Sequence, residues 1–128
     1  MSRVVLDASA LLAVLRQERG HEKLTTEVLR EAAISTVNLS EVQSKFVSFG
    51  MPPDDVWDAA LSVVREVVPF TAEQARITGD LITKTRSLGL SLGDRACLAL
   101  ALLQGAPIYT ADKFWNKLSL GIRIHSIR

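Results

Sequence analysis

The chain has 128 residues, the size of one domain, and 48% of them are hydrophobic, which is enough for a core of its own. Its 15 Lys and Arg nearly balance 14 Asp and Glu, so the net charge of +1 excludes a general electrostatic attraction to nucleic acids or membranes. The first 64 residues carry six basic and nine acidic groups and the last 64 carry nine and five, a basic second half that suits either a nucleic-acid path or a mixed solvated surface. The single cysteine, Cys97, excludes an internal disulfide and a cysteine-based zinc site.

The amino terminus predicts neither a signal peptide nor a membrane span. The first strand is expected within a few residues of Met1, and no charged segment followed by a long apolar run precedes it. We therefore expect one domain over residues 1–128 and a cytoplasmic location.

Strand-like and helix-like segments alternate along the whole chain, which indicates an α/β fold with a parallel or largely parallel sheet. In chain order we expect a strand at 4–6, helices at 9–18 and 21–31, a strand at 32–37, helices at 38–50 and 52–66, a strand at 67–70, helices at 72–88 and 91–105, a strand at 106–110, a short helix at 111–118 and a strand at 122–127. Pro69 cannot donate to strand pairing, so its strand is predicted at the sheet edge. The helix at 91–105 is apolar on nearly every side and is predicted to be buried.

Asp7 directly follows the apolar run Val4–Leu6, which does not alternate and so predicts a strand buried on both faces. Open α/β sheets bind ligands at the carboxyl ends of their strands, so Asp7 is placed for chemistry. The same residue, or Ser9, could equally cap the helix that follows.

Three further acids share this position at the ends of predicted strands. Glu41 lies one turn into the helix after the second strand, and Asp112 begins the helix after the fourth strand. Asp94 lies in the first turn of the buried helix and reaches the same edge only if that helix starts there. The other acids fall mostly on charged helix faces or at a helix start away from this edge.

Capping offers an alternative explanation for two of these acids. Asn38 with Glu41, and Ser91 with Asp94, have the spacing of a capping box. Capping does not explain four carboxylates at one place, because each pair about 5 Å apart would repel by roughly 3 kcal/mol at an effective dielectric constant near 20. A cation would neutralise such a cluster, and oxygen-only ligands favour Mg²⁺ or Mn²⁺.

Four stretches in this order, RVVLDASALLAVL, ISTVNLSEV, LSLGDRACLALAL and IYTADKFW, resemble those of PIN-domain ribonucleases across essentially the whole chain. In length and layout the chain resembles the VapC-type toxins of bacterial toxin–antitoxin pairs. The resemblance implies a PIN-like three-layer sandwich with a mostly parallel five-stranded sheet flanked by helices. It places the family's acidic quartet on Asp7, Glu41, Asp94 and Asp112 and its supporting polar residues on Ser9, Asn38, Thr110 and Asn116.

The resemblance also implies an activity and partners. We expect a divalent-metal endoribonuclease that acts as a toxin on RNA such as tRNA or rRNA, forms a homodimer, and is inhibited in a hetero-oligomer with a VapB-type antitoxin. Phosphodiester hydrolysis needs an activated water and charge stabilisation, which one or two Mg²⁺ or Mn²⁺ ions can supply. The working hypothesis is that Asp7, Asp94 and Asp112 hold the metal and that Glu41 orients or deprotonates the attacking water.

Nearby charges and aromatic residues allow two explanations each. Arg95, Lys113 and Lys117 could contact RNA phosphates or could be solvated surface charges. An apolar group at a turn between two helices could belong to the core or form a groove for a partner's peptide; its members are Phe46, Phe49, Met51 and Trp57.

Two other classes of protein remain as alternatives. A Mg²⁺-binding receiver domain needs adjacent acids after the first strand and an Asp after the third, where this chain has Pro69 and Phe70. A non-enzymatic partner-binding domain would require that the four acids be scattered caps.

Overall fold

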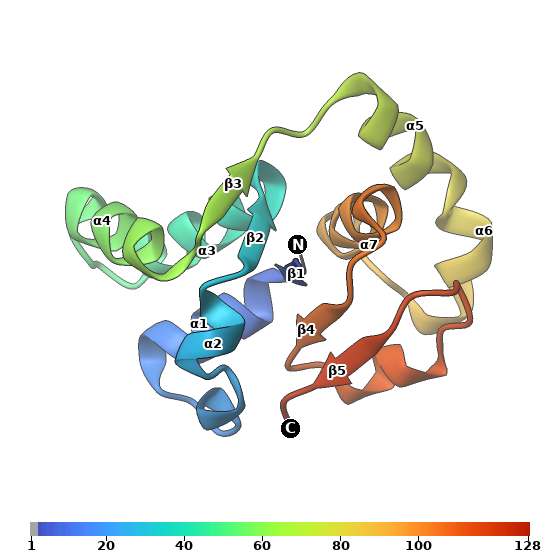
Figure 1. The fold of residues 1–128 in the computed structure, drawn as a ribbon. Coiled ribbons are helices and arrows are strands. Elements are labelled where there is room, and N and C mark those ends of the chain that lie inside the picture. The colour runs from blue at the N-terminus through green and yellow to red at the C-terminus, as the bar shows by residue number, and fades with distance from the viewer. Residues whose placement is uncertain (1–2) are drawn as a thin grey trace.

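The structure is a computed structural model that describes residues 3–128. Within them a five-stranded sheet has the order β3-β2-β1-β4-β5, and every strand pair is parallel (Figure 1). The strands are β1 (Val4–Leu6), β2 (Ala32–Ser35), β3 (Glu66–Val68), β4 (Ile108–Thr110) and β5 (Ile124–Ser126). The predicted edge position of the third strand is confirmed. Because β1 lies between β2 and β4, the direction of the strand order changes there, and this is where open α/β sheets form a crevice.

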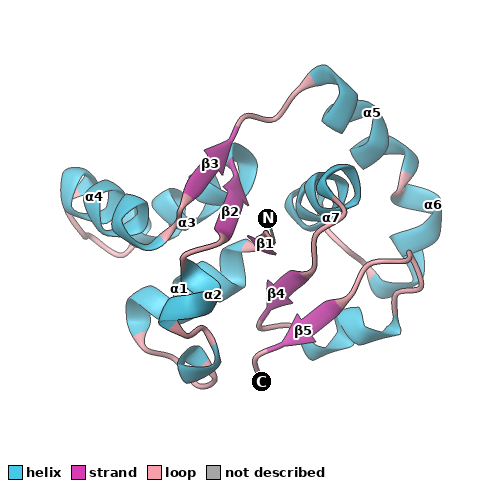
Figure 2. Ribbon diagram, viewed as in Figure 1, coloured by secondary structure: helices cyan, strands magenta, loops and turns pink. Residues whose placement is uncertain are grey.

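Helices cover both faces of the sheet, so the predicted three-layer sandwich is confirmed (Figure 2). One face is covered by α1 (Ala8–Arg16), α2 (Thr26–Leu29), α3 (Thr36–Ser48) and α4 (Pro53–Val63), and the other by α5 (Ala72–Asp80), α6 (Ile82–Thr85) and α7 (Leu92–Gln104). Three short 3-10 helices are η1 (His21–Lys23), η2 (Arg86–Leu88) and η3 (Lys113–Lys117). Among the helices of residues 3–128, none combines the length and hydropathy that crossing a bilayer requires.

The central strand β1 divides the core into two halves. Successive side chains of a strand point to opposite faces, so Val4 and Leu6 pack in the cluster with α1, α3 and α4, while Val5 packs with α7. All three side chains are buried, which explains the apolar run without alternation. Asp7 therefore leaves the sheet from a rigid strand with helices on both sides.

Two long helices predicted from apolar spacing are interrupted, so those predictions are wrong. The segment 21–31 forms η1 and then α2, because the Thr25 hydroxyl accepts from the Val28 amide and starts a new helix. The segment 72–88 is divided into α5, α6 and η2, with the first interruption at the buried Leu81. The ends of most other elements differ from prediction by about three residues or fewer.

The start of α3 is also earlier than predicted. The strand expected at 32–37 ends at Ser35, whose hydroxyl accepts from the Val37 amide and caps a helix that begins at Thr36. Asn38 is therefore inside the helix, and a capping box formed by Asn38 and Glu41 is excluded.

The sheet order also separates this fold from the receiver alternative. Receiver domains have the strand order 2-1-3-4-5, whereas β2 lies between β1 and β3 here. The residues after β3 are Pro69 and Phe70, so no carboxylate follows that strand directly.

Candidate active site at the carboxyl edge of the sheet

Asp7 is the centre of a hydrogen-bond network that joins the ends of β1 and β4. Its Oδ1 accepts from the Ala10 amide at 2.9 Å and from the Ser9 hydroxyl at 2.7 Å, and its Oδ2 accepts from the Thr110 hydroxyl at 2.6 Å. Ser9 Oγ in turn accepts from the Ala111 amide at 2.9 Å. The side chain is only 4% exposed, so Asp7 both caps α1 and holds two strand ends together. Asp7 can therefore cap α1 and also be a residue of the candidate site.

Burial makes the negative charge of Asp7 unfavourable in spite of three hydrogen-bond donors. Loss of solvation raises its pKa from 3.8 to about 6, against the lowering by Thr110, Ser9 and the Ala10 amide, and the charge of Asp94 raises it further. Without a bound cation, the ionised form of Asp7 is therefore disfavoured in the folded protein.

Glu41 projects from α3 toward the first turn of α7. The Asn38 amide donates to Glu41 Oε1 at 2.9 Å and to the Gly93 carbonyl at 3.0 Å, so it ties the carboxylate to the neighbouring helix. A Cβ atom at position 93 would collide with the Glu41 carboxylate, so the carboxylate keeps this position only beside glycine. Gly93 was not predicted as a site residue, although its place immediately before Asp94 was a usable signal.

Asp94 lies at the start of α7, beside this contact. Its Oδ2 accepts from the Ser91 amide at 2.9 Å, and the Ser91 hydroxyl accepts from the Asp94 amide at 3.1 Å, so the second predicted capping box is confirmed. The first turn of α7 contacts Asn38 and Glu41 of α3, and the charge of Asp94 raises the pKa of Asp7.

The buried thiol of Cys97, one turn further along α7, locates the three acids relative to one another. Burial raises its pKa, and the charges of Asp7, Asp94 and Glu41 each raise it further. Carboxylates from three separate elements therefore act on one buried thiol. The contact of Glu41 with Gly93, next to Asp94, brings two of these elements together.

The fourth predicted acid stands apart from the other three. Asp112 is exposed, and its Oδ1 accepts from the Phe114 amide at 2.9 Å as the cap of η3. Its own amide donates to Thr110 Oγ1 at 3.0 Å, so it is one hydrogen-bonded link from Asp7. Asn116 is exposed on η3, and no contact found within residues 3–128 connects it to the acids.

The carboxylates do not form a coordination shell in this arrangement. Within residues 3–128, no group of three His, Cys, Asp or Glu side chains is placed to hold a metal ion together. Asp7, Glu41 and Asp94 each accept instead from protein donors. The ligand set still suits a hard cation, because it offers only oxygen atoms. It includes Asn38 Oδ1, a buried acceptor without a hydrogen-bond partner, and Asp7, whose negative charge is disfavoured by burial.

The three predicted phosphate-binding cations differ in their surroundings. Arg95 points to α5, where its Nη1 donates to the Thr78 carbonyl at 2.8 Å, which indicates a packing role. Lys113 and Lys117 are exposed on η3, beside Asp112.

Comparison with protein families identifies the fold. The PIN domain family matches residues 4–119. This chain belongs to the PIN-domain family. Among curated proteins, none matches it significantly.

Solved structures of other proteins share this architecture. A toxin–antitoxin complex from Klebsiella pneumoniae matches with a TM-score of 0.76 and 18% identity, covering 98% of both chains. DNA-bound VapBC from Salmonella typhimurium matches with a TM-score of 0.75 and 16% identity over 100% of both chains. VapC20 from Mycobacterium tuberculosis, described as a sarcin-ricin loop cleaving toxin, matches with a TM-score of 0.74 and 18% identity, covering 94% of this chain and 98% of that one. At these identities the likeness establishes the PIN fold.

Proposed function

We propose that this PIN domain is a divalent-metal-dependent endoribonuclease and the toxin of a toxin–antitoxin pair. The observation that carries the proposal is the arrangement at the carboxyl edge of the sheet, where Thr110 and Ser9 hold Asp7 and the Glu41 carboxylate lies against Gly93, the residue before Asp94. Family membership and the likeness to toxin–antitoxin structures support it. A cluster of like charges is unfavourable in the protein alone, so its presence is best explained by a cationic ligand.

The residues that would hold the cation are Asp7 and Asp94, with Asp112 from the neighbouring strand end. When bound, Mg²⁺ or Mn²⁺ would stabilise the charge of the phosphorane and make the attacking water more acidic. Ser9 and Thr110 orient Asp7 through their hydroxyls, so their effect on the site passes through that carboxylate.

Glu41 is the proposed proton acceptor. One of its oxygens is oriented by Asn38, and its carboxylate lies against Gly93 beside Asp94. In the reaction, the water oxygen forms a bond to phosphorus and the water proton passes to Glu41, while the bond from phosphorus to the leaving ribose oxygen breaks and solvent water protonates that oxygen. Asn38 is a positioning residue because it bridges Glu41 and α7.

The partners belong to the same proposal. An apolar surface at the α3–α4 turn contains Val47, Phe49, Met51, Trp57 and Leu61, with exposed fractions of 38% to 60%. Phe46 from the predicted group is buried instead, at 6% exposed. Exposed apolar patches of this kind mark protein-binding sites, and we assign this one to a VapB-type antitoxin or to the second subunit of a homodimer. The activity would take place in the cytoplasm, where the RNA substrate is.

The decisive experiment is a cleavage assay on total bacterial RNA with antitoxin-free protein. Lanes with Mg²⁺ or Mn²⁺ are compared with chelator and with Asp94→Asn, whose amide oxygen can still accept from the Ser91 amide. Discrete fragments that require both metal and Asp94 are expected. Intact RNA in every lane, from protein shown to be folded, would contradict the proposal.

A further inference from the structure

A cavity of about 460 Å³ opens beside the proposed active site, at the ends of β1, β4 and β5. Ser9 lines it from the end of β1, and Ala111 and Asp112 line it from the end of β4. The Ser9 hydroxyl that faces this cavity also donates to Asp7. The cavity is therefore continuous with the hydrogen-bond network of the site, at the crevice where the strand order changes direction.

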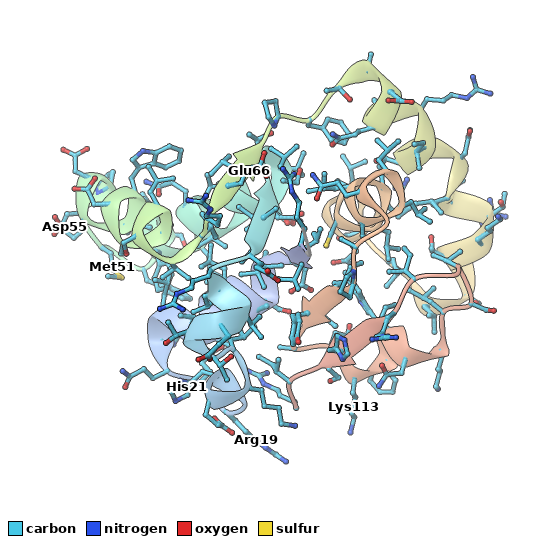
Figure 3. The ribbon with its side chains drawn as sticks, viewed as in Figure 1. Arg19, His21, Met51, Asp55, Glu66 and Lys113 are labelled. Atoms are coloured by element: carbon cyan, nitrogen blue, oxygen red, sulfur yellow. The ribbon has the colours of Figure 1, made fainter. Side chains whose placement is uncertain are left out.

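The cavity has more cations than acids in its lining. Arg19, Lys113 and Arg128 contribute positive charge, and Asp112 is the acid. Arg128 is engaged, because its Nη2 lies 3.1 Å from Glu18 Oε1 and its Nε donates to the Arg19 carbonyl. Arg19 and Lys113 form none of the ion pairs found within residues 3–128, and both extend into solvent at the same edge of the molecule (Figure 3). Two cationic side chains are thus available at the rim.

Phe114 is the aromatic residue of the same lining. Its side chain is 55% exposed, whereas the adjacent Trp115 is 1% exposed in the core. The ammonium groups of Lys113 and Lys117 lie 5.9 and 5.3 Å from the centre of the Phe114 ring. An exposed phenylalanine alone is ordinary, but one that lines a cationic cavity next to a carboxylate cluster has the composition of a single-strand binding site.

We propose that this cavity is a subsite for one unpaired nucleotide of the RNA, with its base stacked on Phe114 and its flanking phosphates on Arg19 and Lys113. The proposal rests on the proposed function and deepens it by assigning the substrate class. Stacking requires a free base face, which a duplex does not offer, so the subsite selects single-stranded segments. The lysines beside the ring are long and exposed, so they can move to the phosphates when a base replaces them.

The test measures binding separately from cleavage. A fluorescein-labelled 12-nucleotide RNA of mixed sequence, single-stranded or paired with its complement, is titrated with the full-length Asp94→Asn protein in Mg²⁺, and anisotropy is recorded at several salt concentrations. Phe114→Ala is introduced into this background. Leu103→Ala is the control, because Leu103 is an apolar side chain that is 42% exposed, lies near the carboxyl end of α7 and does not line the cavity.

Phe114→Ala should weaken single-strand binding by about 5- to 100-fold with an unchanged salt dependence, and should change duplex binding by less than about twofold. Arg19→Gln and Lys113→Gln should each reduce the slope of log affinity against log salt by about 0.7. Leu103→Ala should leave both the affinity and its salt dependence unchanged. Thermal melting of each variant verifies that it is folded.

Equal losses for single strand and duplex, or an unchanged affinity in Phe114→Ala, would overturn the subsite. Unchanged RNA affinity together with lost retention of the co-expressed partner protein would assign the cavity to a protein ligand instead. If the unsubstituted chain cleaves RNA while Phe114→Ala binds normally, only the subsite is wrong. If the chain neither cleaves nor binds RNA, the proposed function fails as well.

Discussion

The starts of α3 and α7 carry the same spacing of polar residues but use it differently. In α7, Ser91 and Asp94 cap the helix through two reciprocal hydrogen bonds. In α3 the cap is Ser35, and the Asn38 amide holds Glu41 against the other helix. Asp94 therefore stabilises the fold as well as the site, whereas Glu41 has no part in starting its helix. A spacing of three residues identifies a cap only where the helix actually begins.

The difference between the two helix starts is most strongly tested by Glu41→Gln. This substitution removes the proposed proton acceptor but keeps an oxygen that can accept from the Asn38 amide. Cleavage should fall by about 100- to 10,000-fold, while the free energy of unfolding changes by less than about 0.5 kcal/mol. RNA gels and denaturant unfolding measure the two effects. A large loss of stability would mean that Glu41 has the structural role assigned here to Asp94 alone.

The contact between the two helices is tested by Gly93→Ala. The new Cβ atom displaces the Glu41 carboxylate, and misplacement by about 1 Å can reduce cleavage by about 100-fold. Stability should remain equal or rise by up to about 1 kcal/mol, because alanine favours helix over glycine and the flexible Glu41 can yield. Gly79→Ala in α5 is the matched control, since its Cβ would enter open space. It should stabilise similarly without reducing cleavage, and equal activity of the two variants would contradict the contact's role.

Burial raises the pKa of Asp7, and the charge of Asp94 adds a smaller increase, so metal-free stability depends on pH. The pKa of Asp7 is about 6 in the folded protein against 3.8 as its ordinary value, so its contribution favours folding below pH 4 and is lost as the pH rises toward and through 6. Asp7→Asn does not titrate there. In chelator it should be more stable than the unsubstituted chain by roughly 1 to 3 kcal/mol above pH 6, and little different near pH 4.

Urea unfolding at these two pH values measures the Asp7 effect. Asn can preserve the hydrogen bonds, since its oxygen accepts from the Ala10 amide and its amide can donate to Thr110. A variant that is less stable at both pH values would show that Asp7 is needed as a charged cap rather than being strained by its charge.

The smallest effects expected are those of the two caps themselves. Ser35→Ala and Ser91→Ala should each reduce stability by about 1 kcal/mol, because each removes the acceptor of a backbone amide at a helix start. Thermal melts of the pair measure this. If Ser35→Ala had no effect, α3 would be capped elsewhere and the difference between the two helix starts would be smaller than inferred.

Much of the fold was predictable because the strands are short buried runs followed by polar residues. The buried α7 and the edge position of β3 were also visible in the sequence, through continuous apolar character and Pro69. The interruptions were not, because the apolar spacing of 72–88 continues through Leu81 and gives no sign that the backbone changes direction. The β-branched pair Thr36 and Val37 favoured a strand, whereas in the structure Ser35 caps a helix that begins at Thr36.

The candidate site was predictable in its acids more than in their arrangement. Strand ends and the family resemblance pointed to Asp7, Glu41 and Asp94. Ser9 and Thr110 are far apart in the sequence, so their shared hydrogen bonding to Asp7 could not be predicted. Nothing in the local sequence showed that the Glu41 carboxylate would lie against Gly93, or that Phe114 rather than its neighbour Trp115 would face outward. These depend on how α7 and η3 rotate when they pack, which is a property of the whole core.

The parallel pairing of β1 with β4 has a consequence for synthesis on the ribosome. Asp7 receives a hydroxyl from Thr110, 103 residues later, and the central strand lacks one neighbour until β4 has been made. Such distant pairing cannot form while the nascent chain is short. The arrangement around Asp7 is therefore completed only after β4 has been synthesised, so chains that end before β4 would lack it.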